Sequence, residues 1–156
     1  MEERRGNTSF FIPWFPDSFE VCRRMPDGKQ FPVVEFDSIS HVIICDDPEE
    51  NAEQLIRERC DALSADAAGL LYFDRENSVL RPLVYVPGAG TVCWESACGS
   101  GTAAIGYWTA WQNSKTVELS LKQPGGELSI RADQTGRAVL GGRVRILRRN
   151  TITVSL

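Results

Sequence analysis

One segment of the sequence combines a cysteine, a group of small residues and a long uncharged apolar run. Glu95-Ser96-Ala97-Cys98-Gly99-Ser100-Gly101-Thr102 is followed without a break by mostly apolar residues up to Trp111. The run is long enough for about three turns of helix. Because a helix that is apolar on every side is buried by protein on every side, we expect the rest of the chain to fold around residues 99–111.

The start of this helix is a place where an anion is stabilised. Free backbone N–H groups at a helix N-terminus carry partial positive charge. Two anions can use it, the thiolate of Cys98 or a substrate carboxylate held by the amides of Gly99 to Thr102. Glycine lets a ligand approach the backbone closely. A second interpretation stays open, in which Cys98 is a small buried residue and the Gly-Ser-Gly turn only begins a helix.

The flanking segments predict an α+β domain in which a curved, mostly antiparallel sheet wraps around the buried central helix. Residues 1–156 form one domain in this prediction, and residues 1–30 form an extended lead-in whose aromatic part, 10–16, is broken by two prolines and lies at an edge. An amphipathic helix is expected over residues 49–63. Turns or bulges are expected at 124–126 and 141–142. Strands are expected at 31–36, 39–45 (central), 69–74, 79–86, 91–94, 116–121, 127–132, 137–141, 143–148 and 151–154.

Composition excludes several classes of function. The net charge of −4 gives no basic surface for nucleic acid. No apolar run approaches the length of a membrane span and no signal-peptide core follows the first residues, so we expect a cytoplasmic protein. Five cysteines without a Cys-x-x-Cys pair argue against a disulfide framework or a zinc site. Cys22, Cys45 and Cys60 are expected to be buried structural thiols, and the only histidine, His41, cannot form a His-rich metal site alone.

Four motifs, in order, resemble one known family. Ala-Cys98-Gly-Ser-Gly-Thr-Ala-Ala is similar to the second cysteine motif of the diaminopimelate epimerase family of cofactor-independent amino-acid racemases and epimerases. Residues 121–130, with Pro-Gly-Gly at their centre, resemble a hairpin of that family, and residues 141–144 stand where the family has a Gly-Pro-Ala step. Ser38-Ile39-Ser40-His41-Val42-Ile43 resembles Gly-Asn-Pro-His followed by an apolar strand. The resemblance covers roughly residues 31–154.

The resemblance implies a function for this chain. It suggests the C-terminal half of an enzyme that inverts the α-carbon of an amino acid without a cofactor or metal, by proton transfer between two cysteines, one from each of two homologous halves. Cys98 would be one acid/base. The substrate carboxylate would be held by the amides of Gly99, Ser100 and Gly101, with the Thr102 hydroxyl nearby. His41 would line the cleft or be a core residue with its hydrogen bonds satisfied, and Glu95 would orient the substrate ammonium or cap the turn.

Departures from the family pattern point away from diaminopimelate as the substrate. Ile39 stands where that enzyme has an asparagine, and Val86-Pro87 stands where it has a Glu-Arg pair. By the resemblance, those polar groups hold the far end of the substrate. Apolar replacements favour an amino acid with another side chain, and the histidine racemases of opine-metallophore pathways are better relatives. Trp94 and Tyr72 would supply an aromatic wall or belong to the core.

The first cysteine motif of the family is absent from these 156 residues. The resemblance therefore implies a partner, either an N-terminal epimerase half or a second subunit, in addition to a small amino-acid substrate. Two other interpretations stay open: a catalytically silent binding or interaction domain that keeps the fold, and an isomerase related to phenazine-pathway enzymes. Little racemisation is expected from a chain with one catalytic thiol.

Overall fold

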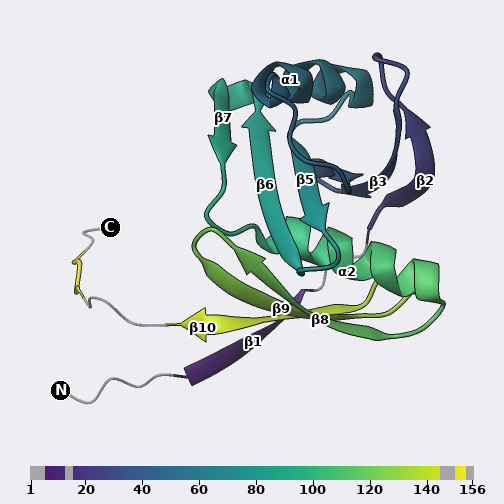
Figure 1. Cartoon of the computed structure of the whole chain (residues 1–156). Coiled ribbons are helices and arrows are strands. Elements are labelled where there is room, and N and C mark those ends of the chain that lie inside the picture. The colour runs from purple at the N-terminus through teal and green to yellow at the C-terminus, as the bar shows by residue number, and fades with distance from the viewer. Residues whose placement is uncertain (1–5, 13–15, 145–149, 154–156) are drawn as a thin grey trace.

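One sheet runs through the computed structural model, which describes residues 6–12, 16–144 and 150–153 (Figure 1). The strand order is β1-β10-β9-β8-β6-β5-β4-β3-β2, with β7 paired to β6 outside this path. Neighbouring strands are antiparallel except at β4–β5 and β6–β8. The strands are β1 (Gly6–Ile12), β2 (Ser18–Arg24), β3 (Gln30–Phe36), β4 (Ile39–Ile44), β5 (Ala68–Asp74), β6 (Val79–Val86), β7 (Thr91–Trp94), β8 (Val117–Gln123), β9 (Gly126–Ala132) and β10 (Ala138–Val144).

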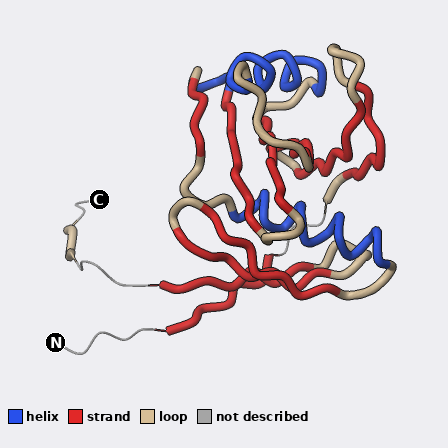
Figure 2. The backbone as a smooth tube through the Cα atoms, viewed as in Figure 1, coloured by secondary structure: helices blue, strands red, loops and turns tan. Residues whose placement is uncertain are grey.

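The helix predicted after Cys98 is α2 (Gly99–Asn113), and it packs against strands from both halves of the sheet order. Strands β8, β9 and β10 contact one side of it, and β3 and β4 contact another. Figure 2 shows strands above and below this helix. Its buried residues share one core cluster with both groups of strands, including Ile105, Trp108, Ile43, Leu121 and Ile130. The sheet therefore bends around α2, and the α+β class is confirmed.

Helix α1 (Ala52–Leu63) packs against β5 and β6 and lies apart from α2 (Figure 1). Ile56 and Leu63 of this helix belong to a second core cluster together with Val42 and Leu70. Strand β4 thus contributes Val42 to one cluster and Ile43 to the other. A strand buried on both faces needs apolar residues at successive positions, which explains the continuous apolar run of residues 42–44 and confirms its predicted central position. A short 3₁₀ helix, η1 (Pro87–Ala89), precedes β7.

Some expected boundaries are wrong. Residues 18–24 form a full strand, β2, within the segment expected to be only a lead-in. The break expected at Gly141-Gly142 does not occur, because both glycines lie within β10 and pair in register with Ser129 and Leu128. A Cβ at Gly142 would lie 3.0 Å from Leu128 Cδ2, so glycine here provides space for a neighbouring side chain and not a turn. Residues 151–153 are not in a strand, and residues 13–15 and 145–149 lie outside the described residues.

Burial of α2 is less complete than expected. Trp111, in its last turn, is 40% exposed and packs against Phe19 of β2 with the ring centroids 5.0 Å apart. The sheet encloses the first turns of the helix and leaves this end at the surface. Within the described residues, neither helix is long and apolar enough to cross a membrane.

Candidate active site

Cys98 is the N-cap of α2, with extended backbone angles (φ −123°, ψ 111°) just before the helix begins. Gln123, the last residue of β8, fixes this position: its side-chain oxygen accepts the Cys98 N–H at 2.8 Å. The Gln123 amide nitrogen donates to the Thr102 hydroxyl at 2.8 Å, and that hydroxyl donates to the Cys98 carbonyl at 2.7 Å. One buried amide side chain therefore ties the cysteine backbone to the first turn of the helix and to the sheet.

The turn after Gln123 packs directly on the segment before Cys98. The Gly125 N–H donates to the Ser96 carbonyl at 2.7 Å. A Cβ at Gly125 would lie 2.9 Å from the Ser96 Cβ and 3.0 Å from its carbonyl oxygen, closer than side chains normally approach. The Pro-Gly-Gly sequence thus makes a turn and also allows two backbones to pack in contact.

The Cys98 sulfur lies among hydrogen-bond donors. It accepts the Gly101 N–H at 3.3 Å, and the Ser100 hydroxyl lies 3.5 Å away. Cys98 as a whole residue is 9% exposed and is therefore largely shielded from solvent. The amides of Gly99 and Ser100 begin the helix, where N–H groups have no intrahelical acceptor and where proteins commonly bind anions. Both residues are half-buried.

His41 lies behind this site and not at its surface. It is 0% exposed on β4, and its Nε2 lies 2.9 Å from the Ser100 hydroxyl. Burial lowers the pKa of His41 to about 3, so the ring is neutral near pH 7. Its Nδ1 has no hydrogen-bond partner. The ring lies over Gly69, its paired residue on β5, where a Cβ would be 2.2 Å from Nδ1.

The other predicted site residues lie at different depths. Thr102 is 0% exposed, and both of its hydroxyl contacts are internal, to Cys98 and Gln123. Gly101 is also buried. Glu95 is half-buried, and its backbone N–H bonds to the Pro82 carbonyl at 2.9 Å. The structure therefore brings Cys98, Ser100, Gly101, Thr102 and His41 into one connected network. The substrate contacts expected of these residues, and of Glu95, stay predictions.

The remaining cysteines differ from expectation at two positions. Cys60 is buried as predicted, but Cys22 and Cys45 are exposed. Cys22 lies on β2, at the edge of the sheet order, and Cys45 comes directly after the last residue of β4. Cys93 is exposed on β7, and all five thiols are free. Among the described residues, no group of three or more His, Cys, Asp or Glu side chains could hold a metal ion.

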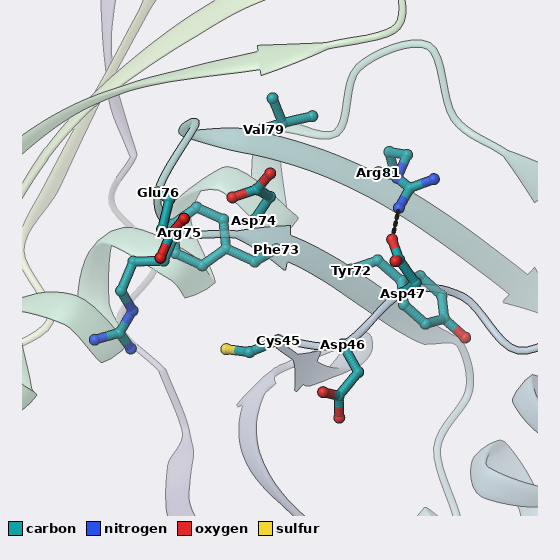
Figure 3. Close-up of a pocket in the computed structure, with 10 residues that line it drawn as sticks. All are labelled: Cys45, Asp46, Asp47, Tyr72, Phe73, Asp74, Arg75, Glu76, Val79 and Arg81. Carbon is teal, nitrogen blue, oxygen red and sulfur yellow. Dashed lines mark hydrogen bonds and ion pairs between the residues drawn. The ribbon is translucent and has the colours of Figure 1, made fainter.

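The predicted aromatic wall is only partly in the core. Tyr72 is 2% exposed and donates its hydroxyl to Glu49 at 2.8 Å, whereas Trp94 is 42% exposed. Their rings lie 5.7 Å apart. Tyr72 also lines an open pocket of about 740 Å³ at the ends of β4 and β5 (Figure 3). Two of its lining residues, Asp47 and Arg81, form an ion pair, and Cys98 is not among the lining residues.

Gln123 and Gly69 are site residues that the sequence analysis did not identify. Gln123 stands immediately before Pro-Gly-Gly. Nothing in a single sequence distinguishes a glutamine that is buried and hydrogen-bonded to the backbone from an exposed one. Gly69 follows Ala68 at the start of a strand pattern, where glycine is unfavourable unless something packs against it. A glycine at this position in a strand therefore indicates that another group packs closely against it.

Comparisons with known proteins give a consistent result. Residues 19–149 match the family described as the histidine racemase CntK N-terminal domain. The chain is 34% identical to a histidine racemase of Staphylococcus aureus over 79 residues, which cover 50% of this chain and 29% of the relative. It is 33% identical to a histidine racemase of Fusobacterium nucleatum over 87 residues, covering 53% of this chain and 33% of the relative. The aligned region thus spans about a third or less of these relatives.

The family description disagrees with one expectation. The matched domain is named as N-terminal, whereas the order of motifs predicted a C-terminal half. In the resembled epimerases the two halves are homologous, so a cysteine at a glycine-rich helix start does not by itself distinguish them. The predicted relationship to histidine racemases is confirmed, and the assignment to the second half is not supported.

Proposed function

The chain belongs to the histidine racemase N-terminal domain family, and from this premise we propose that it is one half of a cofactor-independent amino-acid racemase, with a diaminopimelate epimerase-like fold and histidine as its substrate. Cys98 exchanges a proton with the substrate α-carbon, and a second cysteine on a partner half serves the opposite face. The observation that carries the proposal is the position of the Cys98 sulfur at the N-terminus of α2, within reach of the Gly101 N–H and the Ser100 hydroxyl.

The chemistry requires an acid and a base on opposite faces of the α-carbon. When Cys98 acts as base, its thiolate takes the α-proton and becomes a thiol, and the electron pair of the broken C–H bond moves into the carboxylate. A thiol on the other face then donates a proton to carbon. In the reverse direction the two groups exchange roles, which is possible because both are thiols.

The negative charge that develops on the substrate carboxylate needs fixed donors. The amides of Gly99 and Ser100 belong to the first turn of α2, where they have no intrahelical acceptor, and fixed donors of this kind bind such charge without rearrangement. Gln123 and the docked hairpin hold these amides in place. Binding the carboxylate there would place the α-carbon close to the Cys98 sulfur, as proton transfer demands.

Deuterium incorporation tests the proposal. The chain, alone and together with the half that carries the second cysteine, is incubated with L-histidine in deuterated water, and the α-deuterium content and the D-enantiomer are measured. We expect incorporation in the combined system. Replacing Cys98 with alanine removes a general acid/base, so we expect the rate to fall by about 10²–10⁴-fold.

Cys93→Ala is the matched control, because Cys93 is an exposed thiol on β7 only five positions away. It leaves the rate unchanged in this proposal. Undiminished exchange in Cys98→Ala would exclude Cys98 as the proton-transferring group. No exchange from the combined wild-type halves with any amino acid tested would favour a silent binding domain.

A further inference from the structure

A chain of contacts connects the buried His41 to the Cys98 sulfur. His41 Nε2 lies 2.9 Å from the Ser100 hydroxyl oxygen, and that oxygen lies 3.5 Å from the Cys98 sulfur. The three residues come from β4, the first turn of α2 and its N-cap. A serine between a histidine and a cysteine can accept a hydrogen bond from one and donate to the other.

Which atom donates in each of these two contacts depends on which imidazole nitrogen carries the proton. Nδ1 is buried over Gly69 without a partner, whereas Nε2 has the Ser100 oxygen in reach. A buried N–H without an acceptor is rarer in proteins than an acceptor without a donor. We therefore assign the proton of the neutral ring to Nε2, which donates to the Ser100 oxygen and leaves the Ser100 hydrogen free to point at the sulfur.

We propose that His41 is a positioning residue which, through the Ser100 hydroxyl, directs a hydrogen-bond donor at the Cys98 thiolate. Because this role serves the proton-transferring thiol, it rests on the proposed function. Together with the Gly101 N–H at 3.3 Å, the Ser100 hydroxyl gives the sulfur two donors. Both stabilise the thiolate more than the thiol, because hydrogen bonds to a charged acceptor are the stronger ones.

Among the described residues, the neighbours of Gly99, Gly101 and the Cys98 backbone named here are uncharged. Leu71 of β5 and Leu140 of β10 lie against the positions of Gly101 and Gly99, and Gln123 of β8 bonds to the Cys98 backbone. His41 itself stays neutral across the working pH range, since burial lowers its pKa to about 3. In this relay from His41 through Ser100 to Cys98, the histidine therefore acts as a neutral hydrogen-bond donor, which distinguishes the arrangement from a histidine–cysteine ion pair.

Alkylation of Cys98 tests the relay without requiring racemisation. The protein is treated with iodoacetamide from pH 6 to 10, and a protease that cuts after Glu95 separates the Cys98 peptide from Cys93 for mass spectrometry. Removing the donor in Ser100→Ala is expected to lower the rate of Cys98 alkylation at pH 7 about tenfold, and the difference from wild type is expected to shrink as the pH rises. A merely structural change would alter the rate by the same factor at every pH.

Conservative variants separate the hydroxyl from the side-chain volume. Ser100→Thr keeps the hydroxyl and is expected to retain the rate at pH 7. His41→Gln, which can still donate from its amide, is expected to retain more than His41→Leu. In the relay, adding His41→Leu to Ser100→Ala has no further effect, because the connecting hydroxyl is already gone.

Two results would overturn the proposal. One is a Ser100→Ala rate at pH 7 within twofold of wild type; the other is additive effects of the His41 and Ser100 substitutions. If His41→Leu does not fold, the Ser100→Ala and Ser100→Thr pair still decides whether the donor exists, and His41→Gln decides the role of the ring. Failure of deuterium exchange with an intact alkylation pattern would reject the proposed racemase and leave the relay standing.

Discussion

Gln123→Leu isolates the contribution of the buried amide that holds the cysteine in place. Gln123 is 7% exposed and makes two hydrogen bonds of 2.8 Å, one with the Cys98 N–H and one with the Thr102 hydroxyl. Leucine is similar in size but can make neither. The Cys98 N–H would be left buried without an acceptor, which costs about 1–3 kcal/mol, and loss of the second bond costs about 0.5–1.5 kcal/mol.

The two terms together predict a loss of about 2–4 kcal/mol in the free energy of unfolding. That is a large part of the roughly 5–15 kcal/mol that stabilises a typical domain. For a domain of this size we expect the melting temperature to fall by about 5–15 °C. Urea denaturation followed by tryptophan fluorescence measures the change, with the midpoint lowered and the slope unaltered.

Gln54→Leu is the matched control. Gln54 is exposed on α1, and its side-chain amide donates to the exposed Glu58 at 2.9 Å, so the same chemical change should alter stability by less than about 0.5 kcal/mol. If Gln123→Leu is as stable as this control, the hydrogen bonds of the Gln123 side chain do not hold the Cys98 backbone as described. A lowered slope instead of a lowered midpoint would indicate that the substitution changed the unfolded or folded ensemble.

Two further results follow from the packing around α2. Because burial lowers the pKa of His41 to about 3, the unfolded chain binds a proton that the folded chain excludes, so stability falls by about 1.4 kcal/mol per pH unit as the pH drops below about 6.5. Urea titrations at pH 7 and pH 5 should show this loss of unfolding free energy in wild type and a smaller loss in His41→Gln. Equal losses in the two proteins would contradict the buried neutral ring. In Gly106→Ala, the new Cβ would lie 2.7 Å from Ile130 Cγ1 and 3.2 Å from the Ala132 Cβ, and the overpacking cost of about 1–3 kcal/mol should outweigh the gain of about 1 kcal/mol in helix propensity. A raised melting temperature for Gly106→Ala would contradict this prediction, since β9 would then be able to move away from α2 and accommodate the added methyl group.

The sequence alone determined most of the helices and strands, though not β2, and it determined which cysteine begins the buried helix. Those features depend on local patterns. They are an uncharged apolar run after Cys98, alternation of apolar and polar residues in the later strands, and successive apolar residues in β4, which is buried on both faces. The same local information misplaced a break at Gly141-Gly142, because glycine gives the same signal in the sequence whether it turns the chain or, like Gly142, makes room for Leu128.

Only the tertiary structure decided what surrounds the sulfur. His41 is 59 positions from Ser100 and Gln123 is 25 positions from Cys98, so no spacing rule predicts either contact. The sequence left open whether His41 lines a cleft or belongs to the core, and the parallel pairing of β4 with β5 places it over Gly69, fully buried. A residue's chemical type is fixed by the sequence, but its burial, its hydrogen-bond partner and the charge it can carry arise from elements that meet only when the sheet bends around α2.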